Sequence, residues 1–153
     1  MKTKKIKLKK TKAKTLPQLK AQAWKLFSEV RRRQEADENG VVRCVSCGER
    51  MHWKKSQAGH FIPKVKGLVY WFEGTNVHPQ CVKCNMFQTD YAKVRYTLYM
   101  IDRYGRAEVE RLLKLEKIDY NRAAYNALIL ILKKMVQRSK NSLQIPQHVH
   151  TTQ

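Results

Sequence analysis

Two paired-cysteine motifs decide the fold of this chain, and they lie near the two ends of residues 41–85, here called the cysteine segment, VVRCVSCGERMHWKKSQAGHFIPKVKGLVYWFEGTNVHPQCVKCN. Both motifs have the spacing Cys-x-x-Cys, and their members, Cys44, Cys47, Cys81 and Cys84, are all the cysteines of the chain. Thiolates paired at this spacing are typical of tetrahedral zinc sites. Because four cysteines fill every coordination position of the ion, the sequence predicts a structural zinc site with no position open to substrate.

Four cysteines could instead form two disulfides, as they do in small secreted proteins. A secretion signal contains an apolar stretch near the N-terminus, whereas the first residues here are mostly lysines. We therefore expect a reducing, cytoplasmic environment and a bound metal. We expect no membrane association, because no apolar run approaches the length that a membrane-spanning helix requires.

The composition is strongly basic, with 32 lysines and arginines against 12 aspartates and glutamates, and a formal net charge of +20. A field of that strength attracts polyanions, so nucleic acid is the expected partner. The chain of 153 residues is long enough for one domain with one core. A structural protein bound to RNA would share this composition, so charge alone leaves that alternative open.

The basic residues are concentrated at the N-terminus. Residues 1–15 hold eight lysines and no acidic residue, and such a segment buries too little apolar surface to order itself. We predict a flexible basic arm that neutralises DNA phosphates; the alternative is a tail that only keeps the chain soluble. The residues expected to contact DNA, in the arm and in the rest of the chain, are Lys4, Lys5, Lys9, Lys10, Arg31, Arg32, Arg33, Lys64 and Lys66.

Short strands and one short helix are predicted within the cysteine segment. The strands are expected at residues 41–43, 51–53 and 59–62, with Pro63 ending the last of them. A loop with three successive aromatic residues, Tyr70–Phe72, separates this part from the second cysteine pair. A helix should begin near Cys84.

Outside the cysteine segment, the spacing of apolar residues predicts helices. The first begins near Pro17 and ends at the turn around residues 37–40. Three more helices are expected from residue 89 to about residue 138, and residues 139–153 form a polar tail. The expected apolar faces are Leu19, Ala23, Leu26, Phe27 and Val30 in the first helix, Tyr91, Val94, Leu98 and Ile101 in the second, Val109, Leu112 and Leu113 in the third, and Tyr125, Leu128, Ile131, Leu132 and Met135 in the last.

The centre of the cysteine segment carries side chains suited to metal-assisted phosphodiester hydrolysis. His60 lies at the end of a predicted strand, and Asn76 and Asn85 flank the second cysteine pair. A neutral histidine can deprotonate water at physiological pH, and a divalent cation can stabilise charge on the phosphate. A buried histidine with only a packing role is the competing interpretation of His60.

This arrangement resembles the HNH, or ββα-metal, nuclease motif, and it is similar to the corresponding part of phage endonuclease VII, a junction-resolving enzyme. The resemblance implies that His60 is the general base, that Asn76 orients it, and that Asn85 occupies the place of the final histidine, which ligates the catalytic metal. It also implies a Mg²⁺ or Mn²⁺ ion in addition to the structural Zn²⁺.

Six short motifs carry a second and closer resemblance. They are residues 23–27 (AWKLF), 36–40 (ADENG), 44–48 (CVSCG), 57–63 (QAGHFIP), 76–81 (NVHPQC) and 102–105 (DRYG). With these motifs the chain resembles the NinG (Rap) recombination proteins of lambdoid phages over about residues 16–138. The resemblance implies a phage- or prophage-encoded endonuclease that acts in the bacterial host cell on branched DNA such as Holliday junctions and D-loops.

One position departs from the HNH pattern. Many HNH enzymes have a metal-ligating aspartate or histidine directly before the base, and this chain has Gly59. His78 is the leading replacement, because it lies two positions from Asn76 and so on the same face of an extended segment. Asp90 and Glu73 are weaker candidates. A sparse ligand set is compatible with Mg²⁺, which keeps several waters in protein sites.

The expected fold class is α+β. We expect one domain at residues 16–138, in which four helices surround a small zinc-bound ββα core. The six successive apolar residues 127–132 indicate either deep burial or an interface, and a homodimer would suit the two cuts that a junction needs. The alternative function is that of a non-catalytic zinc-ribbon protein that binds DNA as a recombination accessory. Gly59 and the lack of a final histidine favour this alternative.

Overall fold

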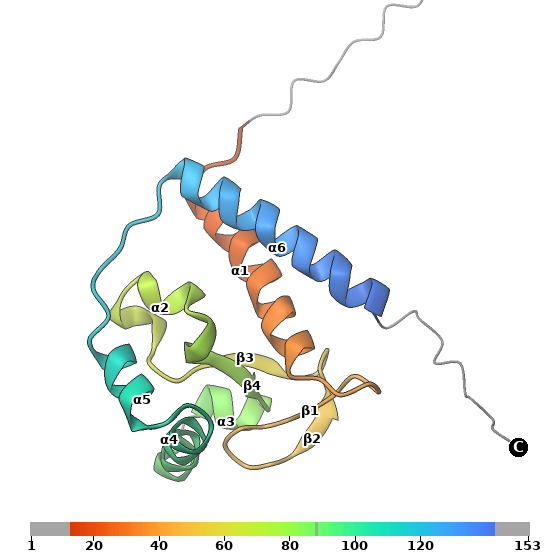
Figure 1. Cartoon of the computed structure of the whole chain (residues 1–153), viewed down its shortest axis with the longest axis vertical. Helices are drawn as coiled ribbons and strands as arrows, with labels where there is room; N and C mark the ends of the chain where they lie inside the picture. The colour runs from red at the N-terminus through yellow and green to blue at the C-terminus, as the bar shows by residue number, and fades with distance from the viewer. Residues whose placement is uncertain (1–12, 88, 143–153) are drawn as a thin grey trace, which may run out of the picture.

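Two long helices from opposite ends of the chain lie side by side above two small antiparallel sheets (Figure 1). The computed structural model describes residues 13–87 and 89–142. The predicted arm residues Lys4, Lys5, Lys9 and Lys10, and the tail from 143 to 153, lie outside the described residues. In order, the helices are α1 (Leu16–Gln34), η1 (Lys64–Lys66), α2 (Val69–Phe72), η2 (Gly74–Asn76), α3 (Val82–Phe87), α4 (Asp90–Tyr104), α5 (Arg106–Leu113) and α6 (Arg122–Ser142).

The strands form two separate pairs. Strand β1 (Val41–Arg43) pairs with β2 (Arg50–His52), and β3 (Gln57–His60) pairs with β4 (Val77–Gln80). Both pairs are antiparallel. Helix α3 directly follows β4, so the second pair and this helix have the order strand, strand, helix. The expectation of an α+β protein is thus confirmed at the level of mixed helices and small sheets.

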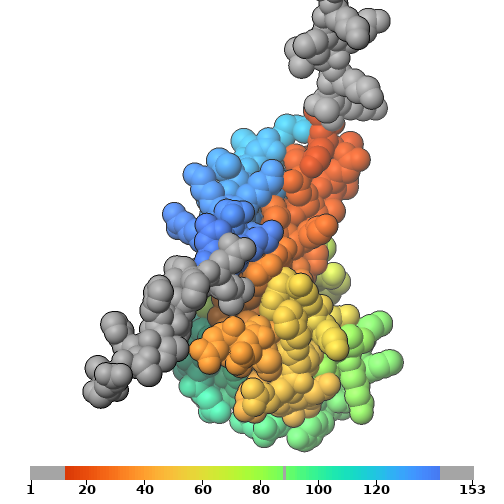
Figure 2. Space-filling model, turned by 90° about the vertical axis from the view of Figure 1, so that its right-hand side faces the viewer, coloured from red at the N-terminus to blue at the C-terminus, as the bar shows by residue number. Residues whose placement is uncertain are grey.

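Helix α1 forms as the sequence predicts. The Thr15 side chain accepts a hydrogen bond from the backbone of Gln18, whose own side chain accepts one from the Thr15 backbone, and Pro17 occupies the first turn. Its buried face, made of Leu19, Ala23, Phe27 and Val30, is the predicted one. That face packs against α6, and Figure 2 shows α6 (blue) running along α1 (orange).

Helix α6 extends past the predicted boundary at residue 138, since it continues to Ser142. Tyr125 and Leu132 are buried as predicted, but Ile131 is exposed, and Ile129 and Val136 are buried instead. The run of apolar residues 127–132 is therefore divided between a face against α1 and a face toward solvent. None of the helices within the described residues is long and apolar enough to span a membrane.

The apolar stripe predicted for α4 does not face the core. Tyr91, Val94, Leu98 and Ile101 are all exposed, and the buried residues are Ala92, Tyr96 and Met100. The reason is a specific tertiary contact, because the Tyr96 hydroxyl donates a hydrogen bond to the Gly59 carbonyl of β3 at 3.0 Å. Similarly, Leu113 of α5 was expected inward with Leu112, yet only Leu112 is buried.

Candidate zinc centre and adjoining cleft

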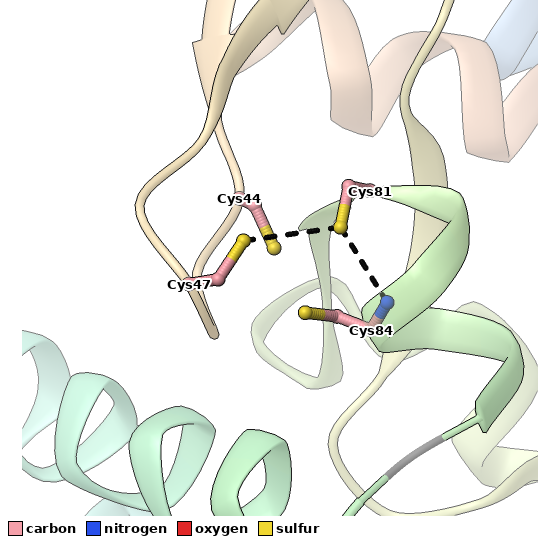
Figure 3. A group of neighbouring side chains, drawn as sticks. All are labelled: Cys44, Cys47, Cys81 and Cys84. Carbon is pink, nitrogen blue, oxygen red and sulfur yellow. Dashed lines mark hydrogen bonds between the residues drawn. The ribbon is translucent and has the colours of Figure 1, made fainter.

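The four cysteines converge at one point between β1 and α3 (Figure 3). Cys44 and Cys47 come from the loop after β1, while Cys81 precedes α3 and Cys84 lies within it. All four sulfur atoms lie within 4.8 Å of one another, and the Cys47 and Cys81 sulfurs are 3.8 Å apart. Zinc–sulfur bonds of about 2.3 Å in a tetrahedron separate the sulfurs by about 3.8 Å. The geometry fits the predicted structural zinc.

The chemistry of the thiols also fits a cation. Burial raises the pKa of Cys81 and of Cys84, so these groups resist becoming thiolates by themselves. For Cys44 the effect of burial is outweighed by hydrogen bonds from neighbouring backbone groups, and its pKa is lowered. Four thiolates this close together would repel one another, and a bound Zn²⁺ would supply the compensating charge.

A cleft of about 530 Å³ extends to Asn85, the residue that follows Cys84. It is lined by two of the three predicted catalytic residues, His60 at the end of β3 and Asn85 in α3. Arg32 of α1 and Lys64 of η1 lie on its walls and give it a positive charge. Because Asn85 directly follows Cys84, the cysteine cluster fixes the position of this side chain in the cleft.

The imidazole of His60 is held between aromatic rings. It stacks on Trp24 with a centroid distance of 4.9 Å, and Trp71 meets it edge-on at 6.5 Å. Burial and the charge of Lys64 lower the pKa of His60 to about 4, while a hydrogen bond with the backbone of Trp71 acts in the opposite direction. The ring is therefore neutral at pH 7. Its Nε2 atom is buried and has no hydrogen-bond partner among the described residues.

Asn76 acts on the backbone and makes no hydrogen bond to the imidazole. Its side chain accepts a hydrogen bond from the Ile62 amide at 2.8 Å and donates to the carbonyls of Ile62 and Tyr70. The residue is completely buried. It thereby fixes the turn that follows His60 and so sets the position of that histidine indirectly. The predicted role, in which Asn76 orients the ring, would suggest a direct contact between the two side chains.

His78 lies away from the cleft and is held by two tyrosines. Its ring is fully buried, and both ring nitrogens are hydrogen-bonded to tyrosine hydroxyls, Nδ1 to Tyr96 at 3.0 Å and Nε2 to Tyr104 at 2.8 Å. It joins β4 to α4 and does not line the cleft. The structure thus separates His78 from Asn85, because the two-residue spacing from Asn76 does not reveal the tyrosines that enclose the ring.

The two weaker candidates for the metal are also placed elsewhere. Glu73 accepts hydrogen bonds from the backbone and hydroxyl of Thr75 and pairs with Arg111 at 3.5 Å. Asp90 is exposed at the start of α4, where it pairs with Lys93 at 3.6 Å. Neither carboxylate lines the cleft.

The basic residues of α1 divide into two groups. Arg31 donates to the Val77 carbonyl and pairs with Glu35, and Arg33 pairs with Glu29 at 2.9 Å. Both side chains are largely buried, so the prediction that they contact DNA is not supported. Arg32 is held by backbone carbonyls, including that of Ser56, on the wall of the cleft. Lys64 and Lys66 are exposed, as DNA-binding residues must be.

Two residues of the cleft were missed by sequence reasoning. Trp24 stacks on His60, and Gln57 accepts a hydrogen bond from the Asn85 amide. Gln57 precedes His60 by three positions within the QAGHFIP motif, which was the available signal. Trp24 belongs to a helix about forty residues away, and nothing local to His60 points to it.

Comparison with known proteins identifies one family. The family model described as bacteriophage lambda NinG protein matches residues 1–143. No curated protein and no solved structure shows a significant match to the chain.

Proposed function

The chain belongs to the bacteriophage lambda NinG family, and on that premise we propose that it is a metal-dependent endonuclease that cuts branched DNA. The observation that carries the proposal is the environment of His60. A neutral imidazole with an unpaired ring nitrogen lies in a basic cleft beside Asn85. This combination suits a general base for hydrolysis of a phosphodiester.

In the proposed reaction, His60 Nε2 takes a proton from a water molecule in the cleft. The water oxygen forms a bond to phosphorus, and the bond to the leaving sugar oxygen breaks. Arg32 and Lys64 hold the phosphate in the cleft by charge-assisted hydrogen bonds. A Mg²⁺ or Mn²⁺ ion would supply stabilisation of the charge that develops on the phosphate and the leaving oxygen.

The preference for branched DNA rests on family membership and on a proposed dimer. The exposed stripe of α4 has the spacing of a helix-pairing seam, since Tyr91, Val94, Leu98 and Ile101 are separated by three, four and three residues. We propose that a second copy of the chain covers this stripe. Two clefts related by a two-fold axis would then make two symmetric cuts in a junction.

The test uses a synthetic four-way junction and a linear duplex, each incubated with the purified protein in Mg²⁺, Mn²⁺ or EDTA. We expect junction cleavage that needs a divalent cation and that falls about 10²-fold or more in His60→Ala. His52→Ala is the matched control, because His52 is an exposed histidine outside the cleft. Cleavage by His60→Ala at the parental rate would show that His60 is not the base.

The second candidate function is a DNA-binding accessory without catalysis. The observation in its favour is that no carboxylate lines the cleft, although carboxylates are common ligands of catalytic cations. Junction binding without cleavage in any of the tested cations would favour this function over the nuclease.

A further inference from the structure

Gly59 marks a place where two amide side chains meet. A Cβ atom at this position would lie 1.8 Å from Oε1 of Gln80 and 3.0 Å from Oδ1 of Asn85. Any side chain at residue 59 would therefore displace the Gln80 amide. The space that a metal-ligating side chain would fill at this position is taken by two oxygen atoms from β4 and α3.

The Gln80 oxygen is buried and has no partner. The residue is only 3% exposed, and its Nε2 donates to the Ser46 hydroxyl at 2.8 Å, which turns Oε1 toward Gly59. Gln80 Oε1 and His60 Nε2 are the buried side-chain polar atoms without a hydrogen-bond partner among the described residues. A buried acceptor left unpaired is costly, and a bound ion is one of the explanations for it.

Asn85 is oriented in a complementary way. Its Nδ2 donates to Oε1 of Gln57, so its own Oδ1 is turned toward Gly59. Both amides are anchored to the cysteine cluster. Gln80 bonds to Ser46, which lies between Cys44 and Cys47, and Asn85 directly follows Cys84. The two oxygens are thus fixed before any ligand arrives.

We propose that Gln80 Oε1 and Asn85 Oδ1 bind a divalent cation, Mg²⁺ or Mn²⁺, and that Gln80 replaces the ligand that Gly59 cannot supply. This inference rests on the proposed nuclease function, because it names the cation ligands of that same site. Amide oxygens are suitable ligands for hard cations. His60 lies beside the pair, since it lines a cavity of about 200 Å³ together with Gln80.

The neutrality of these ligands sets the strength of binding. Neither cavity beside His60 has a carboxylate on its walls, and Lys93, on the wall of the smaller one, adds positive charge. The cation must therefore bind weakly to the free protein, and the DNA phosphate supplies the negative charge that completes its coordination. A carboxylate in place of the Gln80 amide should strengthen binding in the absence of DNA.

The experiment follows Mn²⁺ binding to the zinc-loaded full chain without DNA, by paramagnetic broadening of backbone amide signals in NMR. In the parent protein, the signals of Gly59 and Asn85 should broaden first. Gln80→Glu should need about tenfold less Mn²⁺ for the same broadening, and Gln80→Met should need about tenfold more. Gln137→Glu, an exposed glutamine on α6, controls for the added charge and should behave like the parent.

Unchanged Mn²⁺ dependence in Gln80→Glu would overturn the proposal, whatever the nuclease assay shows. If Gln80→Met fails to fold, as zinc content and spectral dispersion will show, the comparison of Gln80→Glu with Gln137→Glu still decides the question. If Mn²⁺ binds at Gln80 but the protein cuts no DNA, the cation site is supported and the nuclease function is rejected. If the protein cuts DNA but its Gln80 variants bind Mn²⁺ like the parent, the nuclease function is supported and the cation site is rejected.

Discussion

At the scale of single residues, the neutral state of His60 has two sources that can be separated. Burial between Trp24 and Trp71 disfavours the charged ring, and the nearby Lys64 ammonium repels a positive imidazole. Burial is the larger of the two. A DNA phosphate entering the cleft brings negative charge and so raises the pKa of His60, which makes the base stronger when substrate is bound.

We expect the imidazole of His60 to titrate near pH 4 in NMR spectra of the free protein, well below the value of about 6.5 for an unperturbed histidine. Lys64→Met should raise this pKa, because the repulsive charge is gone, and should move the acidic limb of kcat/KM to higher pH. Lys66→Met is the control, since Lys66 is not among the causes of the shift. Titration of the parental ring near pH 6.5 would contradict the buried environment.

The residues of the site were predictable to different degrees. His60 and Asn85 could be singled out from the motif, and the structure places both in one cleft. The ion pairs of Arg31 and Arg33 could have been anticipated, because Glu29 precedes Arg33 by four positions and Arg31 precedes Glu35 by four, which is the spacing of ion pairs on a helix. The enclosure of His78 by Tyr96 and Tyr104 had no such warning, since only the tertiary fold brings them together.

At the scale of elements, the cysteine cluster holds the short helix α3 in place. This helix has six residues and none of them is buried, so its own packing contributes little to its stability. A zinc ion held by Cys81 and Cys84 would tie it to the loop after β1 instead. The position of Asn85, which follows Cys84, would then depend on the metal without touching it.

We expect elemental analysis of protein purified without added metal to show about one zinc per chain. Cys84→Ser should lose the zinc and yield unfolded or insoluble protein, because closure of the cysteine cluster stabilises this part of the fold. Ser139→Cys is a useful control, since it adds a thiol on α6 away from the cluster. A folded, zinc-free Cys84→Ser protein, judged by circular dichroism, would show that the metal is dispensable.

Helices were easier to predict than the faces they bury. For α1, capping, apolar spacing and burial all agree, and the prediction was confirmed. For α4 the sequence offers two stripes, and the more apolar one, with Leu98 and Ile101, is exposed. The stripe with Tyr96 is buried because its hydroxyl bonds to Gly59 and to His78, and periodicity cannot show such contacts.

At the scale of the whole molecule, exposed leucines on two helices allow a test of which helix forms the proposed dimer interface. Leu98→Glu on α4 should convert the protein to a monomer, because a charge would be buried in the proposed interface. Leu130→Glu is the matched control, since Leu130 is an exposed leucine on α6, and it should leave the mass unchanged. Light scattering after gel filtration measures both. A monomeric parent, or a monomer only in Leu130→Glu, would reject the α4 interface.

A deletion that tests the basic arm should stop at residue 12. Thr15 caps α1 and must remain. Deleting residues 2–12 should weaken binding to junction and duplex alike and flatten the salt dependence, since each neutralised phosphate adds about 0.9 to the slope of log affinity against log salt. Affinities measured at several salt concentrations test this. Loss of junction preference with an unchanged salt slope would show that the arm recognises branch geometry.

The packing of α1 against α6 also governs when the cleft can form during protein synthesis. Helix α1 leaves the ribosome first and carries Trp24 and Arg32, but its apolar face is covered by residues that are translated about a hundred positions later. Until α6 has emerged, that face is covered only in part, by contacts such as those of Phe27 and Val30 with Val77 of β4. A nascent chain that carries the cysteine segment but not α6 therefore lacks part of the core that supports α1, and we expect the cleft to be fully assembled only after α6 has left the ribosome.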